Sequence, residues 1–331
     1  MALIAPTVLV LRALGLGDFL TGLPALRALR AGFPGHRLVL AAPRSLADLV
    51  SLAGVADELV DQRGLTAMDW HGNPPELAVN LHGKGPQSHA LLRSVAPVRL
   101  AAFGCPEAGH RGPQWRPEEH EVTRWCRLVS AALDLPADPA DLRLQRPAGP
   151  PRWLPGPPRP TAVVHPGAAY PARRWPVDRW SRVARSLEDR GFGVLVTGDQ
   201  GETALAGEVV RRAGLPPERS TAGRLDLPEL ARLVADARVL LCGDTGVAHL
   251  ATAMGTPSVL LFGPTSPQRW GPPSGGLHRV LWHGDGTGDP WADRPDEALL
   301  RITVDEVLSS LDDQLADLDA ELPSEPLQGP R

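Results

Sequence analysis

The sequence contains little cysteine, almost no lysine and no long apolar segment. Its three cysteines, Cys105, Cys126 and Cys242, lie far apart without metal-ligand spacing, which predicts a reducing, cytoplasmic setting. No apolar stretch approaches the ~20 residues that a membrane-spanning helix needs, and we expect no signal peptide before the first predicted strand. Lys84 is the only lysine, so arginine supplies nearly all the positive charge, a bias typical of a GC-rich genome.

The sequence also has no long run of residues with the same charge. The formal net charge is −4 and no basic stripe is present, which argues against nucleic acid as a partner. Hydrophobic residues make up 43% of the chain, which is enough for full cores, and a length of 331 residues predicts two domains.

Strand-like and helix-like apolar patterns alternate in both halves of the chain. A proline-rich segment, 147–160, lies between the halves and predicts an extended linker, because proline excludes helix and paired strand. The alternation predicts a doubly wound α/β fold with parallel sheets in two domains, 1–150 and 151–303. The predicted strands are 7–11, 37–41, 58–60, 77–81, 162–165, 194–197, 239–242 and 258–262. The predicted helices are 18–30, 45–51, 88–95, 122–133, 178–190, 202–213, 227–236, 247–254 and 304–322, with 271–295 expected to be irregular.

The segment 239–262 contains the clearest site pattern in the chain. A buried strand ends in the glycine-containing turn 243–246, and a helix follows. Free backbone N–H groups and the positive end of the helix dipole meet at such a helix start, which suits a phosphate or a diphosphate. The alternative is an ordinary strand–helix–strand unit in which Asp244 caps the helix.

The first predicted strand is followed by a glycine-containing turn and then Asp18. Gly15, Gly17 and Gly22 do not have the spacing of the dinucleotide-binding fingerprint, and no acid follows the second strand, so nicotinamide binding is disfavoured. Asp18 is either a helix N-cap or a general base at the carboxyl edge of the sheet, facing a cleft.

Polar residues follow other predicted strands in the second half. Arg173 and Arg174 either clamp a phosphate or form a solvated basic pair. Glu202 either holds a ribose hydroxyl or is an acid in the first turn of a helix. His249 stands without a second histidine or acid at zinc-ligand spacing, so we expect no metal site there.

Taken together, these segments resemble glycosyltransferase family 9, the ADP-heptose:lipopolysaccharide heptosyltransferases. The resemblance spans nearly the whole chain and keeps the family's order of motifs. The matching segments are 12–18, 23–27, 80–83, 120–122, 165–168, 173–176, 198–202, 222–223, 227–230, 244–249 and 261–265.

The resemblance implies the GT-B architecture, in which two Rossmann-like domains face a cleft. Domain 1–150 would hold the acceptor, domain 151–303 would hold the nucleotide-sugar donor, and helix 304–322 would pack back on the first domain. Asp18 would be the catalytic base that takes the acceptor's proton, with inversion at the anomeric carbon. Backbone N–H groups of residues 245–247 would stabilise the departing nucleoside diphosphate.

The resemblance also implies which residues bind the substrates. Arg173 stands where the heptosyltransferases commonly carry lysine, which keeps the charge but changes the donor geometry. Val247 replaces the family's usual leucine. No Asp-x-Asp metal motif is present in the relevant loops, so we expect neither an essential metal nor a cofactor. The implied residues are Asp244, Thr245, Gly246, Val247, Arg173 and Arg174 for the donor diphosphate, Gly198, Glu202 and Leu225 for the nucleoside, and Gly17, His82 and Lys84 for the acceptor side.

The function implied by this resemblance is inverting transfer of a heptose from ADP-heptose to a hydroxyl of the lipopolysaccharide core or of another glycan. The partners would be a nucleotide sugar and a glycan or glycolipid acceptor, in the cytoplasm and with at most peripheral contact at the inner face of a membrane. Two alternatives remain. A nucleotide-sugar epimerase or hydrolase on the same fold would turn over the donor without an acceptor, and a non-catalytic nucleotide-sugar-binding protein would have no need of Asp18.

Overall fold

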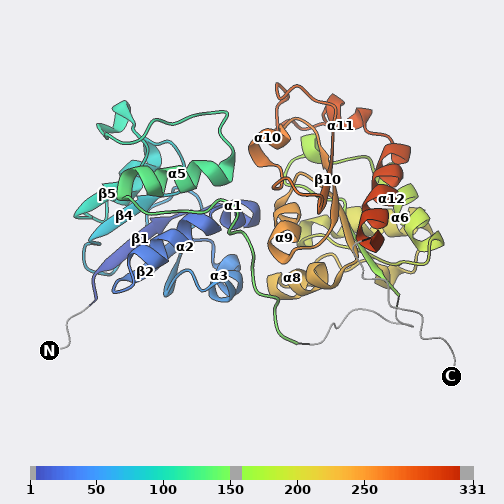
Figure 1. Ribbon diagram of the computed structural model, residues 1–331, viewed down its shortest axis with the longest axis horizontal. Coiled ribbons are helices and arrows are strands. Elements are labelled where there is room, and N and C mark those ends of the chain that lie inside the picture. The colour runs from blue at the N-terminus through green and yellow to red at the C-terminus, as the bar shows by residue number, and fades with distance from the viewer. Residues whose placement is uncertain (1–4, 150–158, 321–331) are drawn as a thin grey trace.

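The computed structural model describes residues 5–149 and 159–320, which form two α/β halves side by side (Figure 1). Each half contains a five-stranded sheet in which every paired strand runs parallel to its neighbour. The strand orders are β3-β2-β1-β4-β5 and β10-β9-β8-β6-β7. The predicted fold class, two parallel sheets covered by helices, is therefore confirmed.

The first sheet is built on β1, whose residues 8–11 are completely buried because helices cover both faces. Its strands are β1 (Thr7–Leu11), β2 (Arg37–Ala42), β3 (Glu58–Asp61), β4 (Leu77–Asn80) and β5 (Arg99–Ala101). The covering helices are α1 (Leu16–Thr21), α2 (Leu23–Gly32), α3 (Ala47–Ala53), α4 (Gln87–Arg93) and α5 (Glu121–Leu133).

The second sheet is likewise buried, except at its edge strand β10. Its strands are β6 (Thr161–His165), β7 (Gly193–Val196), β8 (Val239–Gly243), β9 (Ser258–Phe262) and β10 (His278–Trp282). Its helices are α6 (Val177–Asp189), α7 (Thr203–Ala213), α8 (Leu227–Asp236), α9 (Gly246–Met254), α10 (Pro267–Trp270), α11 (Glu297–Arg301) and α12 (Val304–Ala320). Across the described ranges, none of the helices combines the length and the hydropathy needed to span a bilayer.

Three sequence predictions of local structure need correction. The predicted helix 18–30 is two helices, α1 and α2, which divide at Gly22 because Pro24 sits in the first turn of α2 and favours a new helix start. The edge strands β5 and β10 were not predicted. Only three residues form β5, and β10 is half-buried throughout and lies inside 271–295, the segment expected to be irregular.

The expectation that helix 304–322 packs back on the first domain is wrong for its described part, Val304–Ala320. This helix, α12, packs against α6, β9 and β10 of the second half. Val307 and Leu311 are completely buried in the same core cluster as Trp175, so burial of apolar surface holds the helix on its own domain. Most of the predicted linker, residues 150–158, lies outside the described part of the chain.

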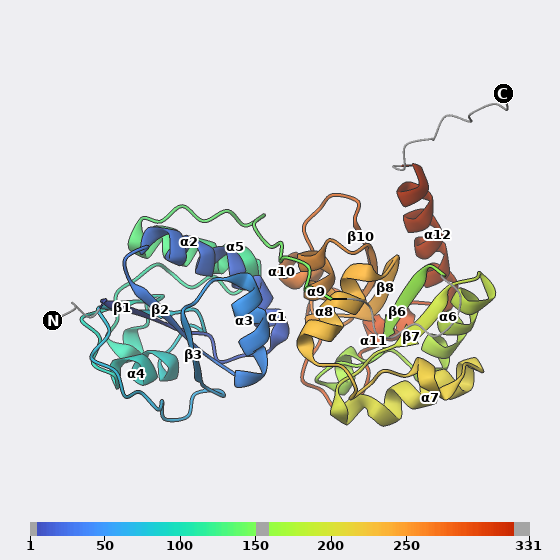
Figure 2. The same ribbon diagram turned by 90° about the horizontal axis from the view of Figure 1, so that it is seen from below.

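The two halves meet where α1 approaches α9 (Figure 2). Both helices follow the carboxyl end of a central strand, β1 or β8, so the two sheets direct their carboxyl edges toward the same interface. His120 before α5 also donates from Nε2 to the carbonyl oxygen of Gly271 in the second half, at 3.0 Å. In doubly wound folds, ligand sites lie at this carboxyl edge.

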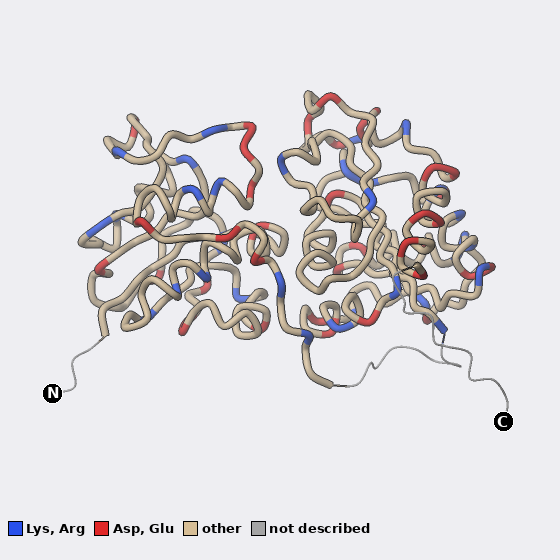
Figure 3. Tube along the Cα trace, viewed as in Figure 1, with Lys and Arg blue, Asp and Glu red and all other residues tan. Residues whose placement is uncertain are grey.

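Basic and acidic residues are interspersed along the chain in both halves of the molecule (Figure 3). In the part of the chain that the structure describes, this arrangement agrees with the absence of a basic stripe in the sequence.

Candidate active site

A cavity of about 1100 Å³ lies between the two halves, at the carboxyl edges of both sheets. It is lined by the loop and helix after β1 and by segments that follow β6, β7, β8, β9 and β10. Its volume suits a ligand as large as a nucleotide sugar. The expected site residues that line it are Gly17, Asp18, Arg173, Arg174, Gly198, Glu202, Leu225, Asp244, Thr245, Gly246 and Val247.

The start of α9 supplies an anion-binding end to this cavity. The N-cap of α9 is Thr245, so the alternative interpretation, in which Asp244 caps the helix, is wrong. The Thr245 side chain makes no capping hydrogen bond. The first N–H groups of a helix have no acceptor four residues earlier in the helix, and here Thr245, Gly246 and Val247 line the cavity, whereas the Ala248 N–H donates to the Thr245 carbonyl oxygen. The site therefore has both the N–H donors and the dipole that favour a phosphate group.

Asp244 and Arg173 form an ion pair beside α9, with 3.8 Å between Asp244 Oδ2 and Arg173 Nη1. Burial raises the pKa of the Asp244 carboxyl, and the charge of Arg173 opposes this effect. Because a carboxylate repels phosphate, Asp244 fits beside an anion site only through its ion pair with Arg173. The neighbouring Arg174 donates from Nε to the Ala168 carbonyl oxygen at 2.8 Å, and so part of its guanidinium is committed to the backbone.

The opposite end of the cavity is formed after β6 and β7. Glu202 Oε2 accepts from the Asp199 N–H at 2.9 Å, while Asp199 Oδ1 accepts from the Glu202 N–H at 3.0 Å, so the two residues form a capping box. Burial raises the pKa of Glu202, and His165, 3.8 Å away, stays neutral because burial lowers its pKa to about 4. Glu202 is therefore an acid at a helix start, which is one of the two interpretations of the sequence, and it also lines the cavity.

Asp18 faces this cavity from the first half of the chain. The N-cap of α1 is Gly15, which excludes the N-cap interpretation of Asp18, a residue of the first helical turn. Its side chain keeps 28% exposure, and its Oδ1 lies 3.9 Å from Arg12 Nη2. Burial raises the pKa of Asp18 above its ordinary value, and the charge of Arg12 works against that rise. A carboxylate with a raised pKa is a stronger general base.

His249 of α9 completes the boundary between the halves. Burial lowers its pKa to about 4, so the imidazole is neutral near pH 7. Its ring packs edge-on against Trp270, with 5.9 Å between the ring centroids.

His82 and Lys84, expected on the acceptor side, do not line the cavity. They lie in the loop after β4, where Lys84 is exposed and the His82 N–H donates to Asn80 Oδ1 at 3.0 Å. Burial, with a smaller contribution from the charge of Arg12, lowers the pKa of His82 to about 4. The loop is therefore positioned behind Arg12 rather than at the cavity wall.

Sequence reasoning missed several cavity residues that follow β9 and β10. Trp291 is 69% exposed although it lines the cavity, which places a large apolar side chain at the cavity mouth. The sequence signal that could have indicated this residue is an aromatic side chain in a glycine-rich segment. Without a predicted strand β10, nothing placed that segment at the carboxyl edge of the sheet. The other missed residues in these segments are Pro264, Thr265, Arg269, Trp270 and Pro290.

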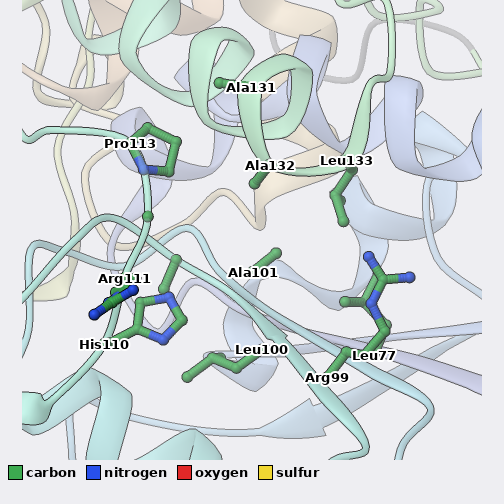
Figure 4. Close-up of a pocket in the computed structure, with 12 residues that line it drawn as sticks. Leu77, Arg99, Leu100, Ala101, His110, Arg111, Pro113, Ala131, Ala132 and Leu133 are labelled. Carbon is green, nitrogen blue, oxygen red and sulfur yellow. The ribbon is translucent and has the colours of Figure 1, made fainter.

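A second cavity, of about 390 Å³, lies on the outer edge of the first sheet (Figure 4). It is formed by β5, the turn 110–113 and the end of α5, with Arg99 and Arg111 at opposite sides. None of the expected site residues lines it, so it is separate from the candidate active site. Within residues 5–149 and 159–320, no group of three or more His, Cys, Asp or Glu side chains is placed to hold a metal ion.

Comparison with known proteins adds an independent line of evidence. The sequence model of glycosyltransferase family 9 (heptosyltransferase) matches residues 110–285. Lipopolysaccharide heptosyltransferase 3 of Escherichia coli is 31% identical over 144 residues, which cover 43% of this chain and 42% of that protein. The chain thus aligns with less than half the length of this curated relative.

Two solved structures share the whole architecture. The structure of E. coli ADP-heptose lipopolysaccharide heptosyltransferase II aligns with a TM-score of 0.77 and 23% identity, covering 95% of this chain and 99% of that chain. An E. coli heptosyltransferase with ADP-2-deoxy-2-fluoro heptose aligns with a TM-score of 0.67 and 18% identity, covering 92% and 99%. These likenesses show that the fold is GT-B.

Proposed function

The chain belongs to glycosyltransferase family 9, and from this premise we propose that it transfers a heptose from ADP-heptose to a glycan hydroxyl with inversion. The observation that carries the proposal is the pairing, across one cavity, of the Asp18 carboxylate from the first half with the helix start at Thr245–Val247 from the second. A base and an anion site on opposite walls are what displacement of a diphosphate by a hydroxyl requires.

The donor is proposed to lie along the carboxyl edge of the second sheet. Its diphosphate occupies the start of α9 beside Arg173, and its nucleoside extends toward Glu202 and Leu225, on the side of β7. The related enzyme that carries ADP-2-deoxy-2-fluoro heptose in its solved structure supports an ADP-sugar as the ligand class. Calorimetry with ADP, GDP, UDP and CDP in metal-free buffer tests the assignment, and we expect ADP to bind most tightly. Preference for another base would contradict ADP-heptose as the donor.

The proposed reaction is a single displacement. Asp18 takes the proton from the acceptor hydroxyl while the hydroxyl oxygen forms a bond to the anomeric carbon. The bond between that carbon and the diphosphate oxygen breaks on the opposite face, and its electron pair leaves with the ADP. Backbone N–H groups at residues 245–247 and the Arg173 guanidinium stabilise the charge that grows on the leaving group.

The acceptor is proposed to be a hydroxyl of the lipopolysaccharide core or of a related glycan, bound on the side of Gly17 and Asp18. The printed names of the curated relatives, lipopolysaccharide and lipooligosaccharide heptosyltransferases, support this class. His82 and Lys84 are retained as acceptor-side candidates only for a portion of the acceptor outside the cavity. Such an acceptor would give the protein peripheral contact with a membrane surface.

ADP release from ADP-heptose, measured with and without a heptose-accepting core oligosaccharide, tests transfer. We expect release to require the acceptor and the product to carry the inverted anomeric configuration. Release at the same rate without acceptor would favour a hydrolase, and a retained configuration would remove the single-displacement mechanism.

A further inference from the structure

A completely buried arginine lies directly behind the proposed base. Arg12 directly follows the strand β1, and its guanidinium donates to the backbone carbonyl oxygens of Asp18 and Leu81. Its Nη2 donates to Thr21 Oγ1 at 3.0 Å, so the contacts of the group fix its plane in one orientation. Gly22 leaves room for this arrangement, because a Cβ there would lie 2.7 Å from Arg12 Nε.

One nitrogen of Arg12 faces two carboxylates. Its Nη2 lies 3.5 Å from Glu121 Oε1 and 3.9 Å from Asp18 Oδ1. Glu121 is the first residue of α5, far from Asp18 in the sequence, and its side chain is only 6% exposed. Its carboxylate is held in place by Trp125, whose Nε1 donates at 2.7 Å, and by Arg124.

The contact between Glu121 and Arg12 bears on how strong a base Asp18 can be. An arginine within about 4–6 Å of a carboxylate favours the ionised form and weakens it as a base, typically by 1–3 pKa units. An unpaired buried cation would therefore make Asp18 a poor proton acceptor. A second carboxylate on the same guanidinium opposes that effect, although Glu121 also pairs with Arg124, and the backbone contacts of Arg12 still hold α1 in position.

We propose that Glu121 is a positioning residue for Asp18, which shares the charge of Arg12 so that this cation orients α1 while its contact with the base stays the longer of the two ion pairs. The inference rests on the proposed role of Asp18. Burial of Asp18 and the charge of Glu121 both raise the pKa of Asp18, whereas Arg12 lowers it, as this arrangement requires. The other charged or titratable groups around the Arg12 centre are Arg124 of α5, His82 after β4, His120 before α5 and His249 of α9.

The test is the pKa of Asp18 measured without any substrate. Protein labelled with 13C at the aspartate carboxyl carbons is titrated by NMR, and the resonance of Asp18 is assigned by its loss in Asp18→Asn. In Glu121→Gln, which keeps the shape but removes the charge and one of the two acceptor oxygens, we expect the pKa of Asp18 to fall by about one unit. Arg12→Met, which removes the cation, is expected to shift it in the opposite direction.

Glu119→Gln is the matched control, because Glu119 stands two residues earlier, pairs with Arg127 at 2.6 Å and does not contact Arg12. We expect it to leave the pKa of Asp18 unchanged. An Asp18 pKa that is the same in Glu121→Gln as in the natural protein overturns the inference. If Glu121→Gln does not fold, Glu121→Met, which has a similar length and no charge, is titrated in its place, and an unchanged Asp18 pKa there has the same meaning.

Turnover of ADP-heptose with acceptor gives a second readout. In Glu121→Gln the acid limb of the pH profile of kcat should move to lower pH, with kcat near neutral pH about three- to tenfold lower and KM unchanged. A merely structural role would not move the limb. Full activity of Asp18→Asn would instead overturn the proposed function, and the NMR result for Glu121 would stand independently of it.

Discussion

Gly17 of the first half and Gly246 of the second lie in direct contact across the domain interface. A Cβ added to Gly246 would lie 3.0 Å from the backbone nitrogen of Gly17, and one added to Gly17 would lie 2.9 Å from Cδ2 of His249. Asp18 follows Gly17, and Thr245 and Val247 flank Gly246, so this contact sets how closely the proposed base approaches the proposed diphosphate site.

A methyl group at Gly246 should therefore separate the two walls of the site. We expect Gly246→Ala to lower kcat about 10- to 100-fold, because an ångström of misplacement at a reacting centre has an effect of this order. Affinity for ADP should change less, since the backbone N–H groups of α9 remain. Steady-state kinetics and calorimetry check this, with Gly207→Ala as the control, because nothing lies within 4 Å of a Cβ there. Equal kcat for Gly246→Ala and Gly207→Ala would show that the contact does not matter for turnover.

Arg173 is expected to carry a large part of the affinity for the donor diphosphate. Arg173→Met should weaken ADP binding about 10- to 100-fold, because hydrogen bonds to charged groups contribute about 1.5–3 kcal/mol each. It also leaves Asp244 as a buried carboxylate without its cation. Arg173→Lys should bind ADP more tightly than Arg173→Met, because it restores the charge. Calorimetry with Arg182→Met, which alters an exposed pair with Asp178, provides the control. An ADP affinity that none of these changes affects would place the diphosphate elsewhere.

Buried neutral histidines should make the fold less stable in acid. Burial holds the pKa of His165 at about 4, below the ordinary value of 6.5 that an unfolded chain restores. Between these values the unfolded chain binds more protons than the folded chain, so the free energy of unfolding falls as the pH drops from 6.5 toward 4. We expect His165→Gln to show a shallower fall in urea unfolding experiments over this range. The same change at the exposed His71 should leave the slope as it is in the natural protein. A slope unaltered by His165→Gln would mean that this imidazole titrates normally.

Much of the fold could be predicted because its strands and helices carry strong patterns. The largely apolar strands β1, β4, β8 and β9 and the amphipathic helices α5 and α6 can be predicted from residue spacing alone. The edge strand β10 could not be predicted in this way. Its half-buried residues show neither the alternation of a strand nor the spacing of a helix. The place of α12 was taken from other folds of the class, whereas its own apolar face, with Val307 and Leu311, fits the second core.

The candidate site divides in the same way. Asp18 and the segment 244–247 follow predicted strands, and parallel strands bring their carboxyl ends together, so their shared cavity was predictable. The Arg12–Glu121 contact joins residues 109 positions apart and has no local sequence pattern. The contact of Gly17 with Gly246 depends on the absence of side chains, which no hydrophobic pattern reports.

The central claim is that Asp18 is the general base of a transfer reaction whose donor is bound by the other half of the chain. The most direct measurement is the turnover of Asp18→Asn with ADP-heptose and acceptor at saturating concentrations, on protein shown by calorimetry to bind ADP normally. The account predicts a fall in kcat of roughly a hundredfold or more, as loss of a general base produces. Unchanged turnover in a protein that still binds ADP would contradict it.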